Sequence, residues 1–205
     1  LPLEKAVAND DQPHLVKVFF SWDTPIGRGR AIGGGMPSWL SAVVGSWQVS
    51  GILNYYSGTP ISITTSTSPL AGVWNGVALR GNIVSSDMKN ESFQRGDFNF
   101  GNTADPMNTY LNKAAFQDPA PLTLGNAAPY LSQVRNFGTI SENLSLQKVV
   151  RFGEKFRFQL RGDFLNAFNR PQWGGLQTNV TNPLFGQITS VSGQRSIQLG
   201  TRLDF

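Results

Sequence analysis

The chain has no cysteine and only one histidine, His14. Disulfides and thiolate metal sites are therefore excluded, and a zinc site is not expected because zinc needs several nitrogen or sulfur ligands. Residues 97–105 match a calcium loop only in part, since Gly101 stands where a ligand is expected and no glutamate closes the loop. No constellation of catalytic side chains is visible, so we expect neither an enzyme nor a bound cofactor or metal.

No apolar run approaches the roughly 18 residues that a membrane helix needs. Charged residues make up only 15% of the chain, whereas glycine and proline number 22 and 12. Such a composition suits β-strands joined by irregular loops. The net charge of +4 is dispersed, and its densest cluster, Arg28 and Arg30, is too small for a nucleic-acid interface. A membrane protein of this composition would have to be a β-barrel.

The amino terminus lacks a feature that an exported protein should have. The chain begins at Leu1 and shows no basic, apolar and small-residue signal peptide. Either the protein is not exported, or this chain is the carboxy-terminal piece of a longer polypeptide; we favour the second interpretation.

The last eleven residues, 195–205, alternate between two faces. Ile197, Leu199, Leu203 and Phe205 share one face of an extended strand, because successive side chains alternate across the pleat. Gln198, Arg202 and Asp204 share the other. A transmembrane barrel must close on its final strand, and an aromatic terminal residue suits the lipid–water interface. This pattern predicts the closing strand of a membrane barrel.

Four further segments show the same alternation. With the last strand, the predicted set covers approximately residues 14–24, 46–58, 140–151, 155–168 and 195–205. Strands in soluble proteins average about five to six residues. Ten residues tilted by about 40° rise roughly 25 Å, the height of the apolar band of an outer-membrane barrel.

The predicted connections are alternately short and long. The turn at Gly153 and the glycine-rich turn after Pro25 are short, whereas residues 60–139 and 169–194 form long, irregular loops. Outer-membrane barrels have short periplasmic turns and long extracellular loops. We therefore predict an all-β, antiparallel transmembrane β-barrel, partial because five strands leave two open edges.

Two sets of side chains are candidates for contact with a solute. The first set, predicted to face the barrel lumen, comprises Arg157, Gln159, Arg161, Asp163, Gln198, Arg202 and Asp204. It could form hydrogen bonds within the wall, or contact a plug or a passing solute. The second set consists of the loop aromatic residues Trp74, Phe93, Phe98, Phe100 and Tyr110. It could stack on a ligand or pack the loop on itself.

Several motifs, in this order and spacing, resemble the carboxy-terminal part of an Oar-like TonB-dependent outer-membrane transporter, of the kind abundant in Acidobacteria. They are residues 22–30 (WDTPIGRGR), 45–51 (GSWQVSG), 57–60 (SGTP), 110–116 (YLNKAAF), 164–171 (FLNAFNRP), 185–189 (FGQIT) and 197–205. The resemblance covers most of the chain from about His14.

The resemblance implies a large plugged barrel in the bacterial outer membrane that actively takes up a bulky solute. It also implies that the barrel-assembly machinery recognises the closing strand through Ile197, Leu199, Leu203 and Phe205. The family's plug domain, TonB box and amino-terminal carboxypeptidase-regulatory-like domain have no counterpart here. The TonB complex would therefore be contacted only through a region that precedes this chain.

Two other functions are compatible with the sequence. One is a structural or adhesive barrel, or one completed by other copies of the chain. The other is a soluble β-sandwich binding module. The solute is open among siderophore, oligosaccharide and peptide.

Overall fold

The computed structural model describes residues 4–66, 79–102, 104–153 and 155–205. The chain divides into two compact units. The strand unit contains residues 15–56, 139–171 and 193–205, and the loop unit contains residues 1–14, 57–138 and 172–192. Trp74, a candidate ligand contact, lies outside the described residues. No helix among the described residues is long and apolar enough to span a membrane.

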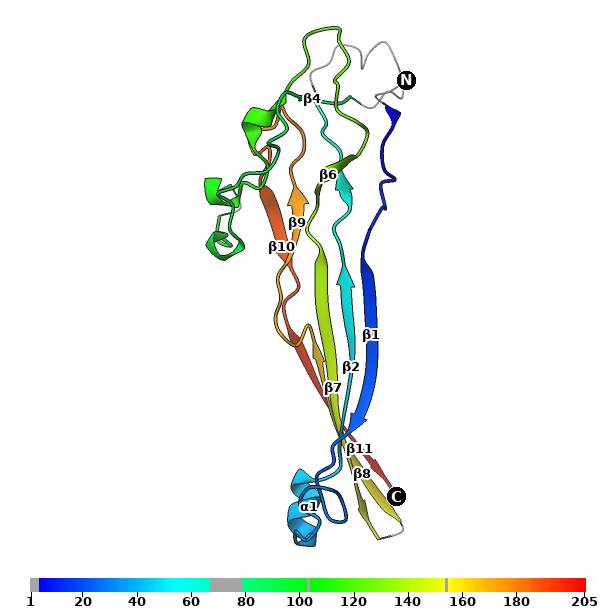
Figure 1. Cartoon of the computed structure of the whole chain (residues 1–205). Helices are drawn as coiled ribbons and strands as arrows, with labels where there is room; N and C mark the ends of the chain where they lie inside the picture. Colours follow the sequence, from blue (N-terminus) through cyan, green and yellow to red (C-terminus); the bar gives the residue numbers. More distant parts are fainter. Residues whose placement is uncertain (1–3, 67–78, 103, 154) are drawn as a thin grey trace. The chain divides into compact units, whose positions relative to one another are not determined.

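The strand unit is built on one five-stranded antiparallel sheet (Figure 1). Its order is β1-β2-β7-β8-β11, and every neighbouring pair is antiparallel. The strands are β1 (Leu15–Asp23), β2 (Trp47–Tyr56), β7 (Thr139–Phe152), β8 (Phe156–Leu165) and β11 (Ser196–Asp204). The antiparallel, mostly β fold that the alternation predicts is therefore present, but the described sheet is open, with β1 and β11 at its edges.

Strand register gives the sheet two different faces. Directly paired residues of antiparallel strands point to the same side. On the first face, Leu144 of β7 lies between Gly51 of β2 and Phe164 of β8. We call this the apolar face, because its other members include Val16, Val18, Phe20, Trp22, Trp47, Val49, Leu53, Tyr55, Leu146, Val150, Phe158, Leu160, Ile197, Leu199 and Leu203. The opposite side is the polar face.

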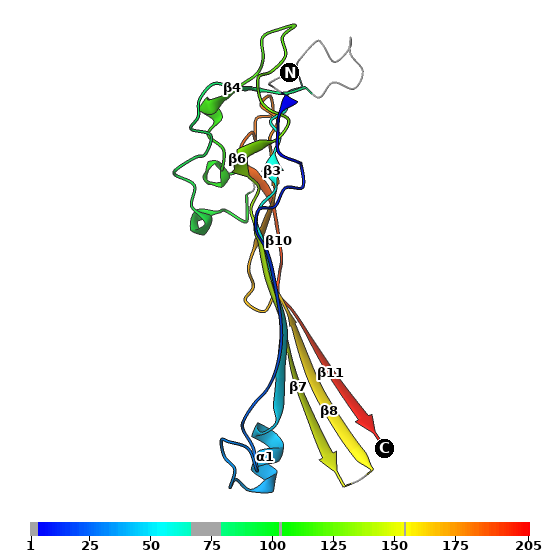
Figure 2. The same ribbon diagram turned by 45° about the vertical axis from the view of Figure 1, so that its right-hand side comes forward.

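Two short connections join strands at one end of the sheet. β7 and β8 meet in a turn at Gly153, whose φ of +66° suits glycine because a side chain is disfavoured there. β1 and β2 are joined by a glycine-rich segment and the helix α1 (Ser38–Val44), which follows Pro37. α1 lies beside the lower end of β2, while β7, β8 and β11 fan away from it (Figure 2).

One predicted strand is too long by three residues. β8 ends at Leu165 and not at residue 168, because Asn166 adopts a left-handed backbone with φ of +48°. Its side chain accepts from the Arg170 N–H at 3.0 Å and donates to the Arg170 carbonyl at 2.9 Å. The Asn166 amide thus fixes a turn over residues 166–170. Phe168 therefore does not continue the strand alternation that begins at Phe156.

The sequence predicted that the two long connections are irregular, and this prediction is wrong for parts of both. They contain short strands that pair with one another: β3 with β6, β4 with β5, and β9 with β10. The strands are β3 (Pro60–Ile61), β4 (Asn82–Ile83), β5 (Phe116–Gln117), β6 (Leu131–Arg135), β9 (Gln172–Leu176) and β10 (Ile188–Ser192). The same connections contain the short 3-10 helices η3 (Arg95–Asp97), η4 (Pro106–Asn108) and η5 (Lys113–Ala115).

The loop unit has a hydrophobic core of its own. Ile63, Leu111 and Val134 are almost fully buried, and Phe116 packs edge-on against Phe185 with ring centroids 5.3 Å apart. Burying one such aliphatic side chain stabilises a fold by about 1.5–3 kcal/mol. The connections therefore form a packed unit.

Candidate functional site

All seven residues predicted to face the lumen lie on the polar face. The register pairs Asp163 with Gln198 and Arg161 with Gly200. The remaining members follow these at intervals of two residues along β8 and β11, so they share the same face. Their common orientation follows from the strand period of two residues. That the polar face looks into a barrel lumen stays a prediction.

A hydrogen-bonded network lies at the middle of the polar face. Arg161 Nε lies 2.9 Å from Asp163 Oδ2, and the Ser145 hydroxyl of β7 donates to the same carboxylate. Near the end of β11, Arg202 Nε lies 2.7 Å from Asp204 Oδ1. Both ion pairs are largely exposed, so each stabilises the fold by at most about 1 kcal/mol.

An open hollow of about 520 Å³ lies on the sheet beside this network. Arg161, Asp163 and Gln198 contribute polar groups to its lining. Phe19 and Ile52 contribute apolar surface, because the register places these two on the polar face. The lining of the hollow therefore combines charged and apolar groups, which suits contact with a protein segment or an amphiphilic solute.

The apolar face is exposed to an extent unusual for large hydrophobic side chains. Leu199 is 78% exposed and Leu203 is 56% exposed. Contiguous exposed apolar surface marks a protein or membrane interaction site. Phe205, which directly follows β11, is 94% exposed.

Two charged side chains interrupt the apolar face, and each has a partner. Lys148 is 6% exposed, and its Nζ donates to the Gly45 carbonyl and lies 5.3 Å from the centre of the Trp47 ring. Glu142 is 8% exposed, and its Oε1 accepts from Arg170 Nε at 2.6 Å. The alternation already places Lys148 on this face. Glu142 lies two residues before Leu144 in β7, so the alternation places it on the apolar face as well.

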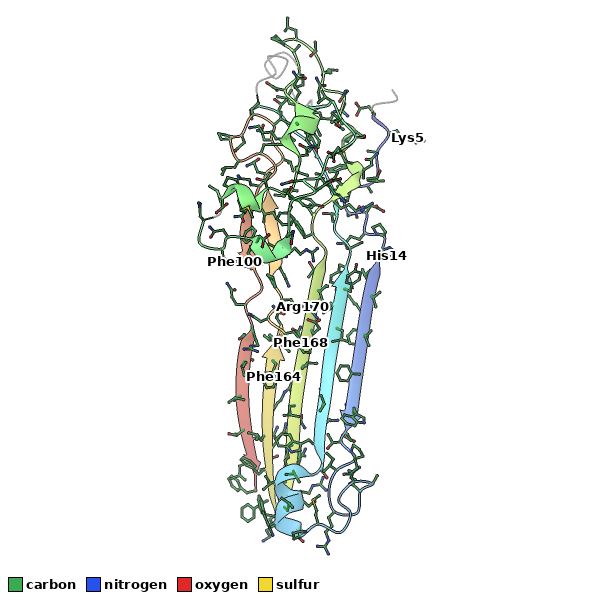
Figure 3. The ribbon with its side chains drawn as sticks, turned by 60° about the vertical axis from the view of Figure 1, so that its left-hand side comes forward. Lys5, His14, Phe100, Phe164, Phe168 and Arg170 are labelled. Atoms are coloured by element: carbon green, nitrogen blue, oxygen red, sulfur yellow. The ribbon has the colours of Figure 1, made fainter. Side chains whose placement is uncertain are left out.

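Arg170 belongs to the turn that ends β8. Its guanidinium lies 5.8 Å from the centre of the Phe168 ring. Phe164, Phe168 and Arg170 follow one another at this end of the strand (Figure 3). The 164–171 motif therefore has a structural role: it ends the strand and supplies the cation that pairs with Glu142.

The loop unit joins four of the five predicted aromatic candidates to two others. The cluster consists of Phe93, Phe98, Phe100, Tyr110, Phe137 and Trp173. Phe98 packs edge-on against Trp173 at 4.6 Å between centroids, and Phe137 lies 4.6 Å from Tyr110. Phe137 and Trp173 are not among the predicted candidates, because they belong to segments outside residues 93–110.

Most of this aromatic cluster is packed within itself, and part of it reaches the surface. Phe98 is buried, whereas Phe100 is 63% exposed beside Trp173. The Arg95 guanidinium lies 5.4 Å from the centre of the Phe137 ring. Burial raises the pKa of the Tyr110 phenol, and the nearby charge of Arg95 opposes this shift.

Several side-chain oxygen atoms of the partial calcium loop accept hydrogen bonds from backbone N–H groups. Asp105 accepts from the Met107 N–H, and this hydrogen bond, with a second from Asn99, lowers the pKa of its carboxyl. Asn99 Oδ1 accepts from the N–H groups of residues 101 and 102. Within the described residues, no group of three or more acidic, histidine or cysteine side chains is placed to hold a metal ion.

Residues 1–198 match the family model described as "Outer membrane beta barrel domain". The chain belongs to this family. No curated protein matches the chain, and neither does any solved structure.

An outer membrane beta barrel domain belongs to the bacterial outer membrane, so the protein is located there. This location argues against the soluble β-sandwich module. The lipid-facing side of an outer-membrane barrel is apolar, so we expect the exposed apolar face to contact lipid.

Proposed function

We propose that this outer-membrane β-barrel domain is part of a TonB-dependent transporter that takes up a bulky solute. The observation that best supports this proposal is the folded loop unit. Its segments are inserted into the strand unit between β2 and β7 and between β8 and β11. Both connections leave the same end of the sheet, opposite the Gly153 turn. A barrel that serves only as an anchor needs no such unit, whereas a receptor needs a shaped surface outside the membrane.

The loop unit offers features that suit a ligand. Phe100 and Trp173 present aromatic surface, and Arg95 adds a positive charge beside Phe137. Aromatic rings with nearby polar groups form typical recognition surfaces. The order and spacing of the sequence motifs support the same transporter class. The solute itself stays open.

The exposed edges of the sheet support a larger barrel. β1 and β11 each have only one strand neighbour in the described sheet. A membrane does not tolerate unpaired backbone groups, so further strands must cover both edges. We expect these strands, together with a plug, from the rest of the protein. The proposed partners are outer-membrane lipid, the barrel-assembly machinery and, through a preceding region, the TonB complex.

The test is whether the complete protein engages TonB. The protein is purified from outer membranes and assayed for binding to the purified carboxy-terminal domain of TonB. A transporter should bind it, and deletion of the protein's amino-terminal region should abolish binding while the barrel remains assembled. Absence of binding by the intact protein would contradict the proposal and favour a structural or adhesive barrel.

A further inference from the structure

The helix α1 exposes apolar side chains that no other described residue of the strand unit covers. Trp39 is 70% exposed and Val43 is 61% exposed, and the helix has no buried residue. These two residues are four apart, so they lie on one side of the helix. Ser38 and Ser41 lie on a different side.

This segment is attached to the apolar face of the sheet. Trp47, the first residue of β2, donates from its indole Nε1 to the Val43 carbonyl at 3.1 Å. Lys148 of β7 donates from Nζ to the Gly45 carbonyl. Trp47 and Lys148 are direct register partners on the apolar face. The carboxy-terminal end of α1 is therefore fixed beside the apolar face of the sheet.

The segment before α1 supplies positive charge. Arg28 donates from Nη1 to the Ser38 hydroxyl at 2.6 Å, and its backbone N–H donates to the Ser41 hydroxyl at 2.9 Å. Arg28 therefore lies on the serine side of the helix, away from Trp39. Tryptophan and aliphatic groups on one side with arginine on another are typical of segments that lie in a membrane interface.

We propose that α1 lies in the headgroup region of the outer membrane, at the end of the sheet that carries the Gly153 turn. The helix contacts the lipid of the leaflet at this end of the sheet, with Trp39 and Val43 directed toward the acyl chains and Arg28 toward phosphate groups. This inference rests on the apolar face being in contact with lipid. It explains why Lys148 is tolerated on that face, since the end of α1 covers its ammonium group and provides a carbonyl acceptor.

Single nitroxide labels provide a direct test, because these 205 residues contain no cysteine that would compete for the label. The complete protein, reconstituted in vesicles of phosphatidylethanolamine and phosphatidylglycerol, carries Val43→Cys, Ala42→Cys or Leu199→Cys. Ala42 is the matched control, because it is exposed, adjacent in sequence and about 100° away around the helix. Collision rates with oxygen, which partitions into lipid, and with a water-soluble nickel chelate report the depth of each label.

The expected ratio of oxygen to nickel collisions is several-fold higher at Val43 than at Ala42, and highest at Leu199. If Val43 and Ala42 are equally accessible to nickel while Leu199 is in lipid, α1 is not an interfacial helix, and the membrane barrel stands. Equal, deep burial of Val43 and Ala42 would also overturn the inference. A water-accessible label at Leu199 would overturn the barrel orientation itself, and the inference with it.

Discussion

The guanidinium of Arg170 lies with its Nε 2.6 Å from Glu142 Oε1, on the apolar face of the sheet. The second oxygen, Oε2, is buried and has no hydrogen-bond partner among the residues that the structure describes. The pair joins the turn after β8 to the neighbouring strand β7. A nearly buried carboxylate is costly unless it is compensated, and Arg170 is the group that compensates Glu142.

Removing the partner of Glu142 should destabilise the barrel. Arg170→Leu leaves a nearly buried carboxylate without its cation, and we expect a loss of about 1–3 kcal/mol, less than for a fully buried pair because Arg170 is half exposed. The measurement is urea unfolding of the complete protein in lipid. The double variant Glu142→Gln with Arg170→Leu should recover much of this loss.

The Arg161–Asp163 pair on the polar face provides a matched comparison. Arg161→Leu should change stability by less than about 1 kcal/mol, because that pair is exposed. Equal losses for Arg161→Leu and Arg170→Leu would mean that the two faces do not differ in environment.

The contrast between the faces can also be tested with an introduced charge. Leu199→Arg should cost about 2–4 kcal/mol if Leu199 faces lipid near mid-membrane. Gln198→Arg, one residue away on the polar face, should be close to neutral. The free energy of unfolding in lipid vesicles measures both changes. If Leu199→Arg is as well tolerated as Gln198→Arg, the apolar face does not contact hydrocarbon.

Deleting Phe205 should impair assembly more than stability. Its side chain is 94% exposed, so it contributes little packing to the sheet. Its proposed role is recognition by the barrel-assembly machinery. We expect reduced amounts of assembled protein in the outer membrane, with an unchanged unfolding midpoint for the fraction that does assemble. Phe205→Tyr keeps the aromatic ring and should restore assembly. Normal surface levels after deletion would contradict the proposed role.

The loop unit should lose stability at alkaline pH through Tyr110. Burial raises the pKa of its phenol in the folded state, and its hydroxyl donates to the Arg135 carbonyl at 3.2 Å. Below the usual tyrosine pKa of about 10 both states are neutral and the contribution is fully present. Above it the unfolded chain loses its proton first, so stability falls as pH rises toward the folded pKa.

The measurement is the tyrosinate absorbance of the complete protein minus that of Tyr110→Phe, followed as a function of pH. The difference curve should have its midpoint above the usual tyrosine value, and the variant should show a weaker loss of stability over that range. A midpoint at or below the usual value would show that the phenol is not held in a desolvated environment.

The sequence by itself determined the five long strands and the side to which each of their residues points. An alternation of apolar and polar residues over nine or more positions indicates a strand. Successive side chains of a strand point to opposite faces, so one assigned residue assigns all the others. The composition of β8, from Phe156 to Leu165, already separates its aromatic side from its charged side. The turn at Gly153 was equally evident, since a hairpin turn requires a residue that tolerates positive φ.

Only the tertiary structure decided what the long connections form. β3, β4 and β5 are two residues long, too short to show any period, and their partners lie far away in the sequence. The ion pair between Glu142 and Arg170 and the joining of Phe137 and Trp173 to the aromatic cluster also depend on such distant contacts. Local pattern sets the direction of a side chain, whereas its partner is fixed by how the whole chain packs.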